Sequence, residues 1–93
     1  MLRNMRHAAR TDATQAEVVK ALRAVGASVY YVKLPLDLLV AHRGRTMLVE
    51  CKEFGGKLTK AQQEFIATWT GEVHVIQGPL EAVAAVLGKE AMA

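Results

Sequence analysis

The chain has 93 residues, of which 52% are hydrophobic, enough for one small folded domain and too few for a second. Twelve Lys and Arg against nine Asp and Glu leave a formal net charge of +3, a mild basic excess that suits nucleic-acid binding without demonstrating it. One cysteine excludes an intrachain disulfide and suits a reducing compartment. No signal-peptide pattern and no apolar run of the roughly 20 residues that span a membrane is evident, so we expect a cytoplasmic protein without a membrane partner.

The first part of the chain combines a basic arm, residues 1–11, with a predicted helix. The basic side chains of the arm recur at helical spacing: Arg3, Arg6, His7 and Arg10. The arm is either a solvated terminus or a segment that contacts phosphates through Arg6 and Arg10. Residues 14–25 are predicted to form a helix that ends before Gly26. Its apolar stripe consists of Val18, Val19, Leu22 and Val25.

Strand and helix patterns alternate along the rest of the chain. The predicted strands cover residues 28–32, 36–41, 45–52 and 73–76, and the further helices cover residues 59–70 and 79–87. Pro79 in its first turn and Gly88 after its last turn delimit the third helix. Three consecutive strands, then a fourth reached through a helix, predict an α/β (α+β) fold with a mixed sheet and helices packed on it.

The second and third strands form a predicted hairpin that carries charged residues. Gly44 is the only glycine between the two apolar runs, so residues 42–45 make the turn. A loop of even length sets a register in which Asp37 lies opposite Glu50, whereas an odd length would separate their faces. The predicted pairs are Ala41–Thr46, Val40–Met47, Leu39–Leu48, Leu38–Val49 and Asp37–Glu50. Lys52 lies two residues beyond Glu50 and therefore shares its face.

Facing carboxylates inside an apolar sheet require compensation. Burying an ion costs several kcal/mol unless it is paired or holds a metal, and like charges directly opposite each other repel. Mg²⁺ or Mn²⁺ between Asp37 and Glu50 would remove that repulsion, because hard cations prefer oxygen ligands. With Lys52 beside it, such a cation suits the cutting of phosphodiester bonds. The alternative is a plain salt bridge between Glu50 and Lys52 on an exposed sheet face.

These residues, in this order of elements, resemble the PD-(D/E)xK nuclease superfamily. Within it the chain is most similar to the small stand-alone VRR-Nuc type, a branch close to archaeal Holliday-junction resolvases. The resemblance covers roughly residues 12–87. Its matching segments are Glu17-Val18-Val19 through Leu22-Arg23 and Gly26, Asp37-Leu38-Leu39-Val40, Arg43-Gly44-Arg45-Thr46, Leu48-Val49-Glu50-Cys51-Lys52, and Gly55-Gly56-Lys57-Leu58-Thr59 leading to Gln62. One departure is Pro35, which stands one residue earlier than the proline that usually precedes the family's aspartate.

The resemblance implies a restriction-endonuclease-like αβββαβ core and specific site roles. The implied catalytic residues are Asp37, Glu50, Lys52 and Gln62. The implied Mg²⁺ or Mn²⁺ ligands are Glu17, Asp37, Glu50 and the backbone carbonyl of Cys51. Lys52 would orient the attacking water or stabilise charge on the phosphorus, as an ammonium beside a metal can.

Structural interpretations compete at several of these positions. Glu17 follows Thr14 by three residues and Gln62 follows Thr59 by three, so each also fits a helix-capping box. The Cys51 side chain points away from the charged face and is expected in the core. His42, at the turn, is expected to be exposed. Four further cations flank the predicted site and could contact phosphates, although each is also an ordinary surface charge: Arg43, Arg45, Lys57 and Lys60.

The leading hypothesis is a metal-dependent DNA endonuclease that selects branched, flap or Holliday-junction DNA by shape, since so small a domain has little surface for reading bases. A symmetric cut of two strands would need a homodimer, which the high apolar content favours. One alternative is a nucleic-acid-binding module of the same fold that does not cut. The other is a small interaction protein whose charges form salt bridges. A bacterial or phage setting would follow from the resemblance alone.

Overall fold

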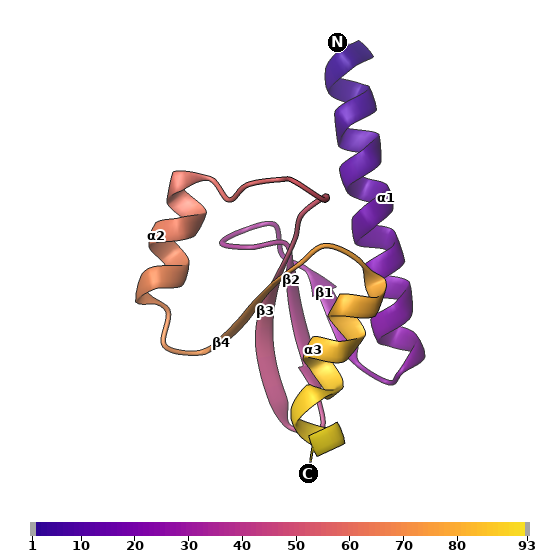
Figure 1. Cartoon of the computed structure of the whole chain (residues 1–93), viewed down its shortest axis with the longest axis vertical. Helices are drawn as coiled ribbons and strands as arrows, with labels where there is room; N and C mark the ends of the chain where they lie inside the picture. Colours follow the sequence, from indigo (N-terminus) through magenta and orange to yellow (C-terminus); the bar gives the residue numbers. More distant parts are fainter. Residues whose placement is uncertain (1, 93) are drawn as a thin grey trace.

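The computed structural model describes the backbone of residues 2–92 and the side chains of residues 13–88. The described residues form three helices and a four-stranded sheet, which confirms the predicted α+β class and the mixed sheet (Figure 1). In chain order the elements are α1 (Leu2–Ala24), β1 (Ser28–Tyr31), β2 (Leu38–His42), β3 (Arg45–Cys51), α2 (Lys60–Thr68), β4 (Glu72–Ile76) and α3 (Pro79–Met92). None of the helices in the described part is long and apolar enough to cross a membrane.

The sheet has the strand order β1-β2-β3-β4, with β1–β2 and β2–β3 antiparallel and β3–β4 parallel. Helix α2 makes the crossover connection that a parallel pair requires. The β2–β3 register is the predicted one over all four pairs from Ala41–Thr46 to Leu38–Val49. Asp37 lies one residue before the start of β2, so the predicted pair Asp37–Glu50 falls just outside the paired part of the two strands.

The β2–β3 turn has two residues and therefore keeps the even loop length on which the register depends. Arg43 and Gly44 both have positive φ, +50° and +82°, as a type I′ turn requires. Because the turn is this short, His42 is the last residue of β2, not part of the loop. It is buried, with its Nε2 atom 3.2 Å from the Val25 carbonyl oxygen, so the expectation that it would be exposed was wrong.

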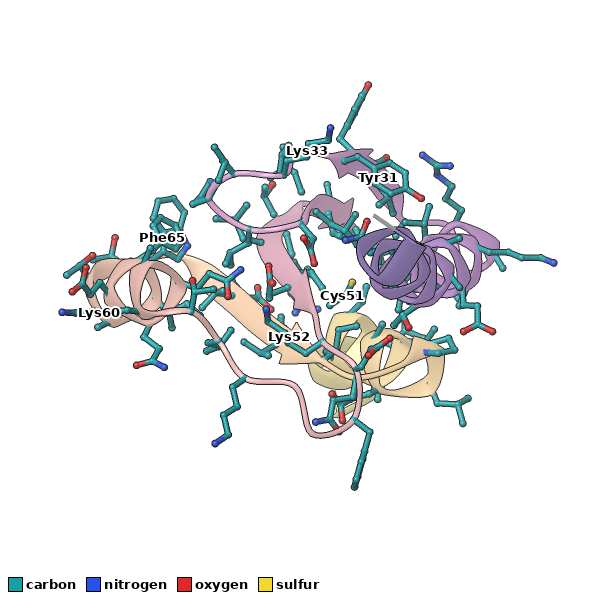
Figure 2. All side chains as sticks on the ribbon, turned by 90° about the horizontal axis from the view of Figure 1, so that it is seen from above. Tyr31, Lys33, Cys51, Lys52, Lys60 and Phe65 are labelled. Carbon is teal, nitrogen blue, oxygen red and sulfur yellow. The ribbon has the colours of Figure 1, made fainter. Side chains whose placement is uncertain are left out.

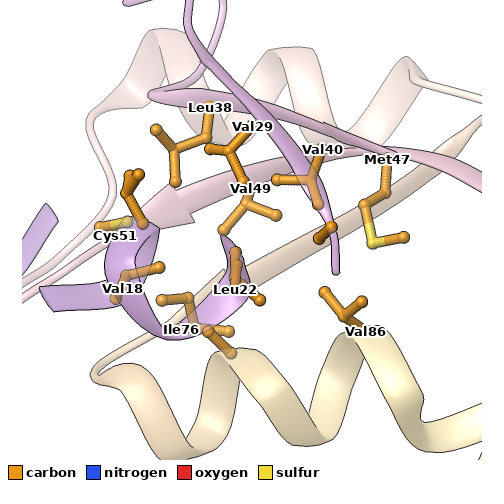
Figure 3. Packing of buried hydrophobic residues seen from close by; sticks show 13 residues of the cluster. Val18, Leu22, Val29, Leu38, Val40, Met47, Val49, Cys51, Ile76 and Val86 are labelled. Atoms are coloured by element: carbon orange, nitrogen blue, oxygen red, sulfur yellow. The ribbon is translucent and has the colours of Figure 1, made fainter. Parts of the chain in front are cut away.

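One face of the sheet packs against α1 and α3 and forms the hydrophobic core (Figures 1 and 3). The helices contribute Val18, Val19, Leu22, Ala82 and Val86, and the strands contribute Val29, Leu38, Val40, Met47, Val49, Cys51 and Ile76. Each fully buried side chain of Val or Leu size contributes about 1.5–3 kcal/mol to folding. Cys51 belongs to this cluster, which agrees with its predicted place in the core.

The opposite face of the sheet is only partly covered. Alternation along β3 puts Leu48 and Glu50 on this face, on the side where α2 stands (Figure 1). Helix α2 has no buried residue among those described, so it lies against the sheet less closely than α1 and α3 do. Large apolar side chains on this side stay partly exposed, including Tyr30, Leu39, Trp69 and Val75.

Helix α1 begins at Leu2, not near residue 14 as predicted. The segment before Thr14 contains no Gly or Pro and is rich in Ala, Arg, Met and Leu, which favour a helix. Thr14 is therefore inside the helix, and the capping box predicted for Thr14 and Glu17 is wrong. At the other end, Gly26 has φ +93°, its N–H donates to the Arg23 carbonyl, and the next N–H donates to the Leu22 carbonyl, which makes a Schellman motif.

Helix α3 starts at Pro79 as predicted but continues through Gly88 to Met92. A glycine inside a helix costs only about 1 kcal/mol relative to alanine. The residues that follow Gly88 are helix formers, so this cost does not end the helix. The strands differ from prediction by one or two residues at their ends.

Candidate active site

Asp37 and Glu50 are held face to face by two hydrogen bonds between the start of β2 and the end of β3. The Asp37 N–H donates to Glu50 Oε1 at 3.1 Å, and the Cys51 N–H donates to Asp37 Oδ2 at 2.9 Å. Each carboxylate therefore accepts a backbone N–H from the other strand. The strand register itself ends at Leu38–Val49, so Asp37 and Glu50 meet through these two hydrogen bonds and not as a further backbone pair.

The loop before Asp37 closes on the Asp37 backbone. The N–H groups of Val32 and Lys33 donate to the Asp37 carbonyl oxygen at 2.9 and 3.3 Å. The Leu34–Pro35 peptide bond is cis, and the Leu36 side chain that follows is fully buried. Pro35 stands one residue earlier than in the family pattern, and the backbone from Val32 to Asp37 forms a turn. The Asp37 carboxylate nevertheless lies next to Glu50.

Glu50 is a buried carboxylate, with 2% of its surface exposed, and three donors surround it. Besides the Asp37 N–H, Gln62 Nε2 donates to Glu50 Oε2 at 2.8 Å, and Lys52 Nζ lies 3.1 Å from the same oxygen. A buried carboxylate is tolerated only when its charge is paired and its oxygens are hydrogen-bonded. The arrangement differs from an exposed salt bridge, because Lys52 is itself four-fifths buried.

Gln62 serves the helix cap and the site at the same time. Its Oε1 accepts the Thr59 N–H at 2.9 Å, and its own N–H donates to Thr59 Oγ1 at 3.1 Å, which completes the capping box at the start of α2. Its Nε2 is left to donate to Glu50. The two interpretations of Gln62 are therefore compatible, and the cap fixes the side chain that holds Glu50.

These side chains line a pocket of about 460 Å³, here called the acidic pocket. It contains all four predicted catalytic residues, Asp37, Glu50, Lys52 and Gln62, together with Thr14, Cys51, Glu53, Gly56 and Lys57. A concave site with a few convergent polar groups is a typical place for ligand binding and catalysis. The sequence-predicted centre therefore coincides with a real hollow of the molecule.

Cys51 borders the acidic pocket, but its thiol belongs to the core. Burial, and to a lesser extent the nearby carboxylates of Asp37 and Glu50, raise the pKa of the thiol to about 12. Figure 2 shows Cys51 close to α1, with Lys52 on the side nearer to α2. A thiol that stays protonated is a poor nucleophile and a poor metal ligand. The metal-ligand role predicted for the Cys51 backbone carbonyl stays a prediction.

Several other predicted residues lie away from the pocket. Glu17 is exposed on α1 and does not line it, although Thr14, one turn earlier, does. Arg43 and Arg45 lie at the turn end of the hairpin, while the carboxylates lie at its other end. Arg45 pairs with Glu72 on β4 and also donates to the Val86 carbonyl.

Two predicted phosphate contacts lie nearer to the site. Lys57 lines the acidic pocket, and Lys60 is exposed in the first turn of α2. Arg6 and Arg10 belong to the part of α1 whose side chains lie outside the described residues.

Glu53 is a pocket residue that the sequence analysis missed. Its Oε1 atom is completely buried and, within the described part of the chain, has no hydrogen-bond partner. The chain turns back here: the Gly56 N–H donates to the Glu53 carbonyl at 2.8 Å, and a Cβ on Gly56 would come within 3.0 Å of that oxygen. Had β3 continued, alternation would have placed Glu53 on the opposite face from Glu50 and Lys52.

The donor set can be tested against a divalent cation. Among the described residues no group of three His, Cys, Asp or Glu side chains is placed to hold a metal ion alone. Mg²⁺, however, is usually bound by only one or two carboxylates and completes its shell with water and substrate phosphate. Asp37 and Glu50 both line the acidic pocket, so the two carboxylates that such a site needs are present. The residues therefore fit a magnesium-type site that is completed by substrate.

No family model matches the chain, and comparisons with curated proteins and with solved structures gave no match either. The acidic pocket is therefore the feature of the molecule from which a function can be inferred.

Proposed function

We propose that this protein is a Mg²⁺- or Mn²⁺-dependent DNA endonuclease that hydrolyses phosphodiester bonds in the acidic pocket. The observation that carries the proposal is the convergence of two facing carboxylates, an ammonium and an amide around Glu50. The element order helix, three strands, helix, strand supports the restriction-endonuclease-like core that the sequence resemblance implies. A cation bound between Asp37 and Glu50 would add to the charge neutralisation that Lys52 already supplies at Glu50.

Four residues of the acidic pocket have distinct parts in the proposed mechanism. Asp37 and Glu50 would hold the cation, which when bound lowers the pKa of its water and stabilises charge on the phosphate oxygens. Lys52 holds its ammonium 3.1 Å from Glu50 Oε2, where it can donate to a phosphate oxygen or to the attacking water. Gln62 keeps Glu50 oriented through its 2.8 Å hydrogen bond and acts as a positioning residue.

Substrate selection would rest on shape and phosphate contacts. Lys57 lines the pocket and Lys60 is exposed on α2, so both are available to the sugar-phosphate backbone. We infer that the preferred substrates are branched, flap or Holliday-junction DNA. A homodimer would supply a second pocket for a symmetric cut, and the partly exposed sheet face that includes Tyr30 and Leu39 offers it apolar surface.

The test is cleavage of labelled single-stranded, duplex, flap and four-way-junction DNA in Mg²⁺ or Mn²⁺. Asp37→Asn keeps an acceptor for the Cys51 N–H, and Lys52→Met keeps the length of the side chain, so both variants should fold. We expect each to lose at least about 100-fold in cleavage rate, as removal of one group that stabilises a transition-state charge usually does. Lys20→Met, which changes an exposed lysine of α1 outside the pocket, should leave the rate unchanged.

Cleavage that survives in both pocket variants would contradict the proposal. DNA binding without any cleavage by the wild-type chain would instead favour a non-catalytic nucleic-acid-binding module of the same fold.

A further inference from the structure

A second hollow, here called the apolar pocket, adjoins the acidic pocket across Gln62. It measures about 530 Å³ and lies between α2 and the loop that follows β1. Leu34 and Pro35 contribute from the loop, and Ala61 and Phe65 contribute from the helix. Gln62 lines both hollows, so the polar acidic pocket and the apolar pocket are neighbours that share this side chain.

The walls of the apolar pocket suit a flat ring. Phe65 lies one helical turn from Gln62, so the two side chains share a face of α2. The Phe65 ring stacks on Trp69, the residue that follows the last turn of α2, with ring centroids 5.2 Å apart. In Figure 2 Phe65 lies on the side of α2 that faces the loop carrying Lys33, and Lys33 itself lines the hollow. The cavity thus combines an aromatic wall, aliphatic walls and one cation.

We propose that the apolar pocket takes one unpaired base of the nucleic acid whose adjacent phosphate lies in the acidic pocket. A nucleotide joins a charged phosphate to a flat ring with apolar faces. The acidic pocket suits the phosphate, and the neighbouring apolar pocket suits the ring. Base–aromatic stacking is tolerant of sequence because every base has a π-face. Lys33 is placed to contact a phosphate of the same strand.

The inference rests on the proposed function and narrows its substrate class. A base can enter the apolar pocket only where it is not stacked and paired. Single-stranded tails and flaps offer such a base at little cost, whereas intact duplex or a fully paired junction must first flip one out. The protein should therefore prefer a cut beside an unpaired nucleotide.

The experiment uses the wild-type chain and fluorescein-labelled flap DNA in Ca²⁺, so that binding is measured apart from cleavage. One series of substrates carries an abasic nucleotide at each position around the branch point in turn, and a second series carries 2-aminopurine at the same positions. We expect one position at which removal of the base weakens binding by about 5- to 100-fold and at which bound 2-aminopurine is quenched by stacking.

Protein variants provide a second, independent comparison. Leu34 is 81% exposed, so Leu34→Ser alters the wall of the pocket without disturbing the core. Leu80, on α3, is 87% exposed and lines neither pocket, so Leu80→Ser is the matched control. We expect Leu34→Ser and Phe65→Ala to weaken binding of the intact flap, to lose the quenching, and to bind the abasic flap as the wild type does. Leu80→Ser should behave as wild type throughout.

The outcomes separate the two proposals. Tight flap binding that no abasic position and no pocket variant changes would overturn the base pocket and leave the endonuclease proposal standing. Failure of the wild-type chain to bind any of the DNA substrates would overturn both.

Discussion

Replacement of Gln62 by alanine removes two hydrogen bonds, one within the N-terminal cap of α2 and one that connects the helix to β3. One joins Gln62 Oε1 to the Thr59 N–H in the capping box, and the other joins Gln62 Nε2 to the buried carboxylate of Glu50. Helix α2 has no buried residue among those described, so polar contacts of this kind carry much of its attachment. The Gln62→Ala variant therefore measures how firmly the helix anchors the site.

The expected loss of unfolding free energy in Gln62→Ala can be estimated from the two hydrogen bonds that are removed. A hydrogen bond to a charged group contributes about 1.5–3 kcal/mol, and its loss leaves Glu50 with one donor fewer in a buried place. The capping bond is exposed, so water replaces part of it and its loss costs about 0.5–1 kcal/mol. Alanine returns a few tenths of a kcal/mol through its higher helix propensity. The net loss is about 2–4 kcal/mol, or roughly 8–30 °C in Tm for a domain of this size.

Urea unfolding at pH 7, followed by circular dichroism, measures this free energy. Thr59→Ala removes the other half of the capping box and should cost about 1 kcal/mol. Gln63→Ala, in the next position, loses only an exposed bond to the Leu58 carbonyl and should cost less than about 1 kcal/mol. If Gln62→Ala costs no more than Thr59→Ala, the bond to Glu50 contributes nothing, and the account of how the site is held would be wrong.

Three further predictions concern the thiol, the turn and an ion pair. Since the Cys51 pKa is raised to about 12, the unfolded chain releases its thiol proton first, and stability should fall as pH rises above about 9. Urea unfolding between pH 8 and 10.5 should show this slope in the wild type and a flatter one in Cys51→Ala. Gly44→Ala places a Cβ at φ +82° and should lower the free energy of unfolding by about 1–2 kcal/mol. Thr46→Ala, in β3 where no positive φ is required, should lower it by less. The Glu72 pKa is lowered, mainly by the hydrogen bond from Arg45. The ionised carboxylate therefore stabilises the fold above its unfolded pKa, near 4.5, and this contribution is lost as the pH falls. Glu72→Gln should make the loss of stability below about pH 5 less steep.

Each of these has a clear contrary result. Rapid labelling of Cys51 by a thiol reagent in the folded protein at pH 8 would contradict the buried, protonated thiol. Full retention of stability in Gly44→Ala would contradict the type I′ turn. An acid-unfolding curve unchanged by Glu72→Gln would show that its ion pair with Arg45 contributes nothing.

The hairpin and its facing carboxylates could be predicted because their determinants are local. One glycine between two apolar runs places the turn, and the two-residue alternation of strands carries that placement outward to Asp37 and Glu50. The capping box of α2 is likewise visible as Thr59 followed three residues later by Gln62. The Gln62 amide also donates to Glu50, twelve residues away in sequence. This contact depends on how α2, the crossover helix, is placed against the sheet, which the sequence pattern does not give.

The helix ends and the outer contacts of the site could not be predicted in this way. A capping pattern such as that of Thr14 is worth about 1 kcal/mol, which the helix propensity of the preceding segment outweighs. Arg45 forms an ion pair with Glu72 on β4. Because β4 pairs with β3 only through a crossover, the sequence did not show that the Arg45 charge is used in this ion pair. Glu53 was missed because the chain leaves the strand after Cys51, and alternation no longer applies beyond that point.

The central claim is that Asp37 and Glu50 bind a divalent cation together with the substrate phosphate. Its most direct test is electron paramagnetic resonance of Mn²⁺ titrated into the wild-type chain and into Asp37→Asn, each with a phosphorothioate flap oligonucleotide that resists cleavage. We expect the wild-type complex to bind Mn²⁺ at a saturable site and Asp37→Asn to weaken this binding at least tenfold. Equal Mn²⁺ binding by the two chains would contradict it.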